Sequence, residues 1–186
     1  SAQLVLEYGQ LDDASRERVR DLYTVTRSLS DRVTQLLNFS RVGALQRVRL
    51  EPRDVIERAL REIESQLAAA GVSVVRRFET GAAQIEGDRN ILVQAVLELL
   101  GNAKDALQGG GSVTVLCRVC DADAGLVELG VIDNGPGMSE DVKRRAFELF
   151  FTRKPKGSGV GLATVKRAAE LHNGYVVIAD ADPRGA

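Results

Sequence analysis

Three glycines stand at alternate positions, Gly157, Gly159 and Gly161, within the segment RKPKGSGVGLATVKRAAELHNG (153–174). Glycines this close together let the backbone approach a ligand and turn its N–H groups toward it. The helix predicted just after them adds partial positive charge at its start, which suits an anion such as a phosphate. A turn or a flexible linker has the same composition, so this loop alone leaves both interpretations open.

A polar stripe marks the segment DRNILVQAVLELLGNAKDAL (88–107). Helical spacing places Glu98, Asn102 and Asp105 on one narrow face and the apolar residues on a broad opposite arc. The Asn102 carbonyl oxygen could coordinate Mg²⁺, and the Glu98 carboxylate one turn earlier could accept a proton or orient a nucleophile. A solvated helix face would show the same pattern, and on this helix alone it is the preferred interpretation.

A carboxylate ends the predicted strand in LVELGVIDNGPGMS (126–139). Asp133 is followed by a rigid Gly-Pro-Gly turn, which could present the carboxylate at the bottom of a cleft. Such an acceptor suits the exocyclic amine of a heterocycle, and Gly137 would leave room for the ring. An ordinary turn explains the same residues equally well.

The segment AFELFFTRKPKG (146–157) joins three phenylalanines, Phe147, Phe150 and Phe151, to a basic, proline-containing stretch. This order predicts a lid whose aromatic residues anchor it and whose basic part closes over phosphates; an exposed surface loop is the alternative. The P-loop pattern is absent from the sequence, and neither glycine cluster has the spacing of a dinucleotide-binding fold.

The composition limits the classes of function to consider. The chain of 186 residues is 44% hydrophobic, with a net charge of −1, so it can bury a core and has no overall positive field favouring nucleic acid. No stretch is apolar enough to span a bilayer. Cys117 and Cys120 lie three apart on a predicted strand, on opposite faces, which favours two reduced thiols over a zinc or redox pair.

The elements predicted around these segments are an N-terminal helix and an α/β layer. One long helix is expected from about Asp12 to Arg41, after the end of another helix in AQLVLEY (2–8). Two helices cannot bury that apolar seam alone, so pairing with a second chain is favoured over packing on the same domain. Strands are then expected at 47–50, 72–79, 83–87, 112–119, 126–133 and 175–180, and helices at 53–70, 88–107, 140–150 and 160–172.

Four segments in order resemble the N box, first glycine box, F box and second glycine box of sensor histidine kinases: ELLGNAKDAL, VIDNGPGM, FELFFTRK and GSGVGLATVKRAAELHNG. The resemblance spans roughly 48–180, and the segment FFTRKPKGSGVGL is most similar to the nitrogen-sensor-like branch. It implies an α+β fold, a two-layer α/β sandwich of the Bergerat type that binds ATP. LLNFSRVG (36–43) resembles the end of the dimerising hairpin in these kinases. We therefore expect a partial hairpin in residues 1–45 and the catalytic ATP-binding domain in residues 46–186.

The resemblance also implies a role for each matching residue. Asn102 would coordinate Mg²⁺ bridging the ATP phosphates, Glu98 would polarise the phosphate acceptor, and Asp133 would accept a hydrogen bond from the adenine amine. Lys154 would contact the γ-phosphate, with Arg153 as a weaker candidate, whereas Lys104 and Asp105 match positions whose roles vary. The residues shaping the base pocket and the phosphate end would be Gly135, Gly137, Gly157, Gly159, Gly161 and Leu162.

One feature departs from the family. The sole histidine, His172, closes the helix after the second glycine box, where a structural role is expected, so no phosphorylatable histidine is present. We expect that the chain begins downstream of the acceptor, binds ATP and does not autophosphorylate. The alternatives are a degenerate kinase and a kinase that phosphorylates another protein. The strand usually found after DADPRG (180–185) is also missing, which favours a trimmed chain.

The resemblance implies a mechanism and partners. The γ-phosphoryl group of ATP would pass to a histidine outside this chain and then to an aspartate of a response regulator. We expect a homodimer through the N-terminal helices, no nucleic-acid partner, and a cytoplasmic location, with membrane attachment only through segments outside this sequence. The alternatives are a chaperone-type ATPase clamp, a serine kinase of the same superfamily, and a dimerising scaffold without ATP binding.

Overall fold

The structure is a computed structural model that describes residues 12–40, 45–79, 84–120, 126–154 and 157–181 of the chain. It separates into two compact units, Ser1–Val42 and Gly43–Ala186. The hairpin turn and preceding helix expected within residues 2–11 lie outside the described residues, as does most of the linker after the long helix.

The first unit consists of the helix α2 (Asp13–Ser40), close to the expected span. Its first turn is capped by Asp12, whose Oδ1 accepts a 2.7 Å hydrogen bond from the backbone N–H of Ser15. This bond lowers the pKa of the Asp12 carboxyl from its ordinary value. Leu22 and Val25 are 66% and 63% exposed, so the described part of α2 carries apolar side chains that are open to solvent.

The second unit has a three-stranded sheet in the order β2 (Val72–Glu79), β4 (Gly111–Val119) and β5 (Val127–Asp133). Strand β4 runs parallel to β2 and antiparallel to β5, with Val72 opposite Gly111 and Val113 opposite Asp133. A smaller antiparallel pair joins β1 (Val48–Leu50) and β3 (Ile85–Gly87).

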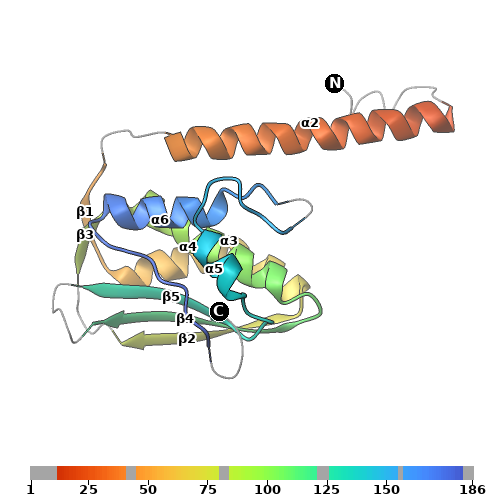
Figure 1. Ribbon diagram of the computed structural model, residues 1–186. Coiled ribbons are helices and arrows are strands. Elements are labelled where there is room, and N and C mark those ends of the chain that lie inside the picture. The colour runs from red at the N-terminus through yellow and green to blue at the C-terminus, as the bar shows by residue number, and fades with distance from the viewer. Residues whose placement is uncertain (1–11, 41–44, 80–83, 121–125, 155–156, 182–186) are drawn as a thin grey trace. The chain divides into compact units, whose positions relative to one another are not determined.

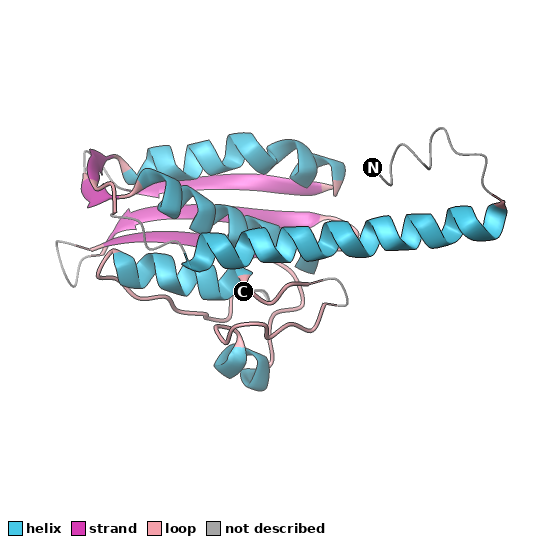
Figure 2. Cartoon of the chain, turned by 90° about the horizontal axis from the view of Figure 1, so that it is seen from above, coloured by secondary structure: helices cyan, strands magenta, loops and turns pink. Residues whose placement is uncertain are grey.

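The helices of this unit lie on one side of the three-stranded sheet (Figure 1, Figure 2). They are α3 (Pro52–Ala69), α4 (Arg89–Ala106), α5 (Glu140–Arg145) and α6 (Gly161–Leu171). Helices α3 and α4 pack on each other and on the sheet, and α6 packs on α4. The result is the two-layer α+β sandwich predicted from the sequence, with a sheet of mixed direction.

Local signals account for the ends of the two central helices. Pro52 occupies the first turn of α3, where its missing N–H costs nothing, and Gly71 takes a φ of +71° just after the helix ends. Asp88 caps α4 by accepting hydrogen bonds from the N–H groups of Asn90 and Ile91.

The core lies between α3, α4 and β4. Its fully buried side chains are mostly aliphatic and include Ile56, Leu60, Leu67, Leu100, Val113 and Val115. Cys117 is buried in this core and Cys120 is only partly buried, and the two form no disulfide.

Two predicted elements differ in the structure. The helix expected at 140–150 ends at Arg145, because the chain continues in tight turns to Phe150, whose left-handed φ of +68° no helix continues through. No strand forms at 175–180. Burial does alternate there, with Tyr175 and Val177 75% and 69% exposed. However, Val176 packs on the cluster between α4 and α6 instead of joining a sheet.

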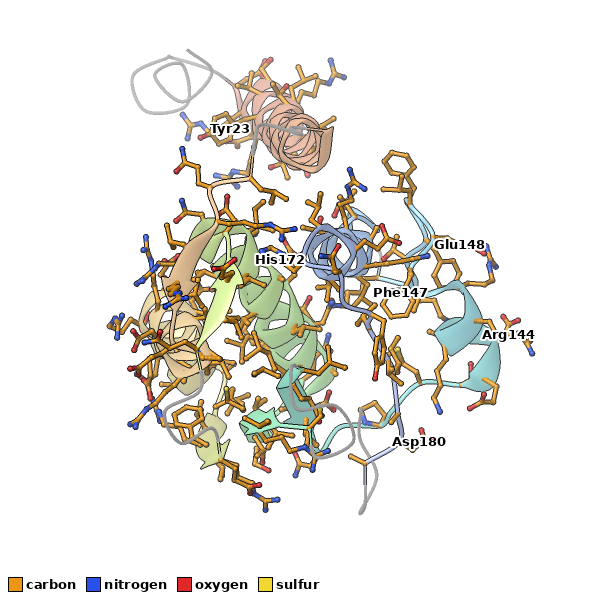
Figure 3. The ribbon with its side chains drawn as sticks, turned by 90° about the vertical axis from the view of Figure 1, so that its left-hand side faces the viewer. Tyr23, Arg144, Phe147, Glu148, His172 and Asp180 are labelled. Atoms are coloured by element: carbon orange, nitrogen blue, oxygen red, sulfur yellow. The ribbon has the colours of Figure 1, made fainter. Side chains whose placement is uncertain are left out.

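The segment 175–180 is held at its end by an ion pair. The Lys143 ammonium on α5 donates hydrogen bonds to Asp180 (2.7 Å) and Glu140 (2.8 Å), and these bonds raise its pKa from the ordinary value. Figure 3 shows Asp180 below α5, with Arg144 on the outer side of that helix.

Candidate nucleotide-binding site

The polar stripe of α4 faces the start of α6. A Cβ atom at Gly161 would lie only 2.7 Å from Oε2 of Glu98 and 3.9 Å from Nδ2 of Asn102. Gly161 does not have a positive φ, so glycine is needed here for space and not for backbone conformation. The second glycine segment therefore lies directly against two of the predicted site residues, whose side chains are partly buried.

A side chain that the sequence reasoning missed orients Glu98. The Nε2 group of Gln94, one turn earlier on α4, donates a 3.0 Å hydrogen bond to Oε1 of Glu98. This leaves Oε2 as the oxygen that faces Gly161. The spacing of four residues within a predicted helix was the available signal.

Asp133 ends β5 and is 9% exposed. Its Oδ1 accepts a 2.8 Å hydrogen bond from the N–H of Gly135. A Cβ at Gly135 would lie 2.7 Å from that oxygen and 3.4 Å from Cβ of Ala106, so the turn is pressed against the last turn of α4. Among the described residues Oδ2 of Asp133 has no hydrogen-bond partner, which leaves a buried acceptor available to a ligand.

The turn after Asp133 is fixed to the sheet by Asn134. Its Oδ1 accepts a 2.8 Å hydrogen bond from the N–H of Ser112, and its own N–H donates to the carbonyl of Ser112 at 3.2 Å. Gly137, the last glycine of the turn, has a φ of +73°, a conformation that favours glycine. Asn134 is thus a structural residue that sets the direction of Asp133.

Lys154 reaches across the site to α4. Its ammonium donates hydrogen bonds to Oδ1 of Asn102 (3.0 Å) and Oδ2 of Asp105 (2.7 Å). Its backbone is held by a bond from its N–H to Oγ1 of Thr152 and by one from the N–H of Gly157 to its carbonyl. Asp105, which matches a motif position with a variable role, makes the shorter of the two contacts.

The two ends of the predicted lid are joined at its base. The N–H of Phe150 donates a 2.8 Å hydrogen bond to the carbonyl of Gly159, and both residues have left-handed φ values. A Cβ at Gly159 would overlap the backbone of Phe150, with its Cα only 2.7 Å away. This position therefore requires glycine for both conformation and space.

The phenylalanines do not all anchor the lid as predicted. Phe150 is 62% exposed because its left-handed backbone turns the side chain outward. Phe151 instead lies beneath the guanidinium of Arg145, whose carbon is 4.3 Å from the ring centroid. Phe147 lies on the inner side of the segment, toward α6, while Glu148 lies on its outer side (Figure 3).

Part of the predicted site thus gathers around the C-terminal half of α4. Asn102, Glu98 and Gly161 meet at one side, Asp133 and Gly135 lie at the end of the helix, and Lys154 bridges to Asn102. Leu162 is different, because its side chain packs on the apolar cluster of Ala95, Val165 and Ala168 and so holds α6 on α4.

The residues present suit a nucleotide with its metal better than a metal alone. No group of three or more His, Cys, Asp or Glu side chains that could hold a metal occurs in the described part of the chain. Asn102 offers one neutral oxygen, so an Mg²⁺ ion there would take most of its ligands from phosphates and water. Asp133 offers a buried carboxylate oxygen, and the absence of a side chain at Gly161 leaves space beside Glu98.

Comparison with known proteins identifies the family of this domain. Residues 87–186 match the family described as histidine kinase-, DNA gyrase B-, and HSP90-like ATPases. The histidine protein kinase DivJ of Caulobacter vibrioides is 32% identical over 180 residues, 92% of this chain and 30% of DivJ.

Two solved structures extend the comparison. The mycobacterial sensor histidine kinase MprB is 34% identical, with a TM-score of 0.63, over 75% of this chain and 91% of that one. Full-length ShkA in complex with AMPPNP is 27% identical, with a TM-score of 0.71, over 91% of this chain and 36% of ShkA.

These matches define the fold as that of a histidine kinase-type ATPase domain. The chain belongs to the sensor histidine kinase family and comprises its ATP-binding catalytic region. It spans about a third or less of the length of the first curated relatives. No helix among the described residues is both long and apolar enough to cross a membrane.

Proposed function

We propose that this chain binds ATP with Mg²⁺ and presents the γ-phosphoryl group for transfer to a histidine on a segment outside the present sequence. The observation that carries the proposal is the close approach of Gly161 to Glu98 and Asn102. It brings a helix start suited to phosphates beside an oxygen suited to the metal.

Each end of the nucleotide would have its own recognition group. The free Oδ2 of Asp133 would accept a hydrogen bond from the adenine amine, with Gly135 and Gly137 leaving room for the ring. Asn102 would supply the protein oxygen to Mg²⁺, and Lys154 would neutralise charge on the terminal phosphate. The backbone from Gly157 to Gly161 would line the phosphates.

Glu98 is the proposed catalytic residue. ATP, when bound, supplies the phosphoryl group, and transfer needs positioning and charge neutralisation more than covalent assistance from the protein. Glu98 would accept the proton of the incoming imidazole or polarise it through Oε2. The hydrogen bond from Gln94 to Oε1 would hold the carboxylate in that direction.

Two partners are proposed, a second copy of this chain and a response regulator. The family and the exposed apolar residues of α2 support them. The exposed Leu22 and Val25 support a homodimer through the N-terminal helices, since a second copy would cover them. The acceptor of the phosphoryl group after the histidine would be an aspartate of a response regulator. We assign residues 1–45 to the partial dimerisation hairpin and 46–186 to the catalytic domain.

Calorimetric titration with ADP in the presence of Mg²⁺ tests the proposal on the chain as it is. We expect the wild type to bind ADP. Asp133→Asn should lose at least about tenfold in affinity, because an amide nitrogen or a reoriented oxygen cannot replace the buried carboxylate. Asn102→Ala should lose affinity for ADP in a Mg²⁺-dependent manner. Incubation with γ-labelled ATP should leave this chain unlabelled. Absence of ADP binding by the folded wild type would contradict the proposal and favour a scaffold without ATP binding.

A further inference from the structure

The Lys154 ammonium lies where a metal ion would be expected. It is 3.0 Å from Oδ1 of Asn102, the oxygen proposed to coordinate Mg²⁺, and 2.7 Å from Oδ2 of Asp105. Asn102 and Asp105 are three residues apart on α4, so both side chains point to the same side of the helix. Asn102 and Asp105 thus bind a cation supplied by the chain itself, the ammonium group of Lys154.

An ammonium group and a magnesium ion cannot share that oxygen. Mg²⁺ requires its ligands at about 2.0–2.1 Å in octahedral geometry, and two positive charges at one neutral amide oxygen would repel each other. A metal–nucleotide complex that uses Asn102 must therefore displace Lys154 from it. The free-energy cost of this displacement depends on the other contacts of the Lys154 ammonium. The shorter of its two side-chain contacts is the ion pair with Asp105.

We propose that Asp105 is a positioning residue that holds the Lys154 ammonium over the metal position of the nucleotide-free chain, so that Lys154 competes with the metal–nucleotide complex for Asn102. The inference rests on the function proposed above for Asn102. It assigns to Asp105 a role in setting nucleotide affinity without contact between Asp105 and the nucleotide.

The expected size of the effect is modest. The Lys154 and Asp105 side chains are 42% and 46% exposed, so solvent screens their attraction. Exposed ion pairs change an equilibrium by up to about fivefold. Removing the charge of Asp105 should accordingly shift the competition by about two- to fivefold.

The contact is tested first without nucleotide. Lysine side chains are labelled with an amine-reactive reagent and quantified by peptide mass spectrometry in the wild type and in Asp105→Asn. Lys154 should react about two- to fivefold faster in the variant. Lys143, held by Glu140 and Asp180 with its side chain 13% exposed, serves as an internal reference that should not change. An unchanged rate at Lys154 would overturn the proposal.

A double-mutant cycle on ADP·Mg²⁺ affinity then separates the competition from a general charge effect. Asp105→Asn should tighten binding by about two- to fivefold when Lys154 is present and should have no effect in a Lys154→Met background. Asp141→Asn is the matched control, because it removes one carboxylate from an exposed pair with Arg144 on α5. Its affinity should equal that of the wild type.

The outcomes distinguish this inference from the proposed function. Tighter binding that persists in the Lys154→Met background would indicate simple charge repulsion and overturn the inference. Weaker binding in Asp105→Asn would mean that Asp105 supports the metal directly, which also overturns it. Failure of the wild type to bind ADP would instead contradict the proposed function, while the labelling experiment would still report on the lysine contact.

Discussion

His172, labelled beside α6 in Figure 3, accepts at Nε2 a 2.8 Å hydrogen bond from the backbone N–H of Asp88. Its Nδ1 lies 2.7 Å from the carbonyl of Ala168 and must carry the proton, since Nε2 is the acceptor. The imidazole thus joins the end of α6 to the start of α4. This arrangement agrees with the structural role expected for His172, and both of its ring nitrogens are engaged.

We expect His172→Ala to lower the free energy of unfolding by about 1–3 kcal/mol, because the partly buried N–H of Asp88 loses its acceptor. Urea unfolding at neutral pH measures the change, with an unchanged denaturant slope as evidence that the native fold is retained. Stability equal to that of the wild type would show that water replaces the imidazole without loss.

Asp88 is expected to contribute more than an ordinary helix cap. Its carboxylate accepts hydrogen bonds from Asn90 and Ile91 at the start of α4, and from the N–H of Gln46, which follows the linker from α2. Asp88→Ala should therefore cost about 1–2 kcal/mol.

The matched variant Asp88→Asn keeps one oxygen acceptor of the same shape. It should lose clearly less stability than Asp88→Ala in the same urea experiment, since asparagine is also a good N-cap. Equal losses in the two variants would contradict the capping role of the side chain.

The two glycines before α6 should respond differently to alanine. At Gly159 the added Cβ meets the backbone of Phe150, and the φ of +67° is unfavourable for alanine. Gly159→Ala should lower the free energy of unfolding by more than about 1 kcal/mol. At Gly161 the added Cβ meets the end of the Glu98 side chain, which can rotate away. We therefore expect Gly161→Ala to retain its stability and to bind ADP·Mg²⁺ more weakly.

Thermal unfolding and calorimetry on the same two variants check this contrast. A large loss of stability in Gly161→Ala, or unimpaired nucleotide binding by it, would contradict the placement of Glu98 against the start of α6.

The cap of α2 should depend on pH. The hydrogen bond from Ser15 lowers the pKa of Asp12 below its ordinary value of 3.8. The ionised carboxylate is the favoured form in the folded state, so its stabilisation is present above pH 3.8 and is lost as the pH falls through the lowered pKa. The amide proton shift of Ser15, followed by NMR, should titrate with a midpoint below 3.8.

Asp12→Asn provides the control for this titration. Asparagine caps a helix about as well as aspartate but does not ionise in this range. The titration of the Ser15 amide should therefore disappear in the variant; its persistence would assign it to another carboxyl group.

Much of this protein could be predicted from its sequence because the relevant signals are local. Pro52, Gly71 and Asp88 mark helix ends through their own backbone preferences and hydrogen bonds to residues within a few positions. The strand periodicity of 112–119 and 126–133 likewise predicted strands β4 and β5, whose antiparallel direction the structure shows. The four ordered motifs predicted the family, and residue type limited what each could bind.

The tertiary structure decided which of these residues meet. Gly161 lies against Glu98, and Lys154 reaches Asn102 and Asp105. His172 accepts a hydrogen bond from the backbone N–H of Asp88. These residues are far apart in the sequence, so no local preference encodes their contacts. Two predicted elements also differ because of tertiary contacts. The helix expected at 140–150 ends early, since Phe150 has a left-handed φ beside Gly159, and the strand expected at 175–180 does not form, since Val176 packs between helices. Periodicity reports which side of a segment is apolar, whereas the neighbour that covers it depends on how the whole core packs.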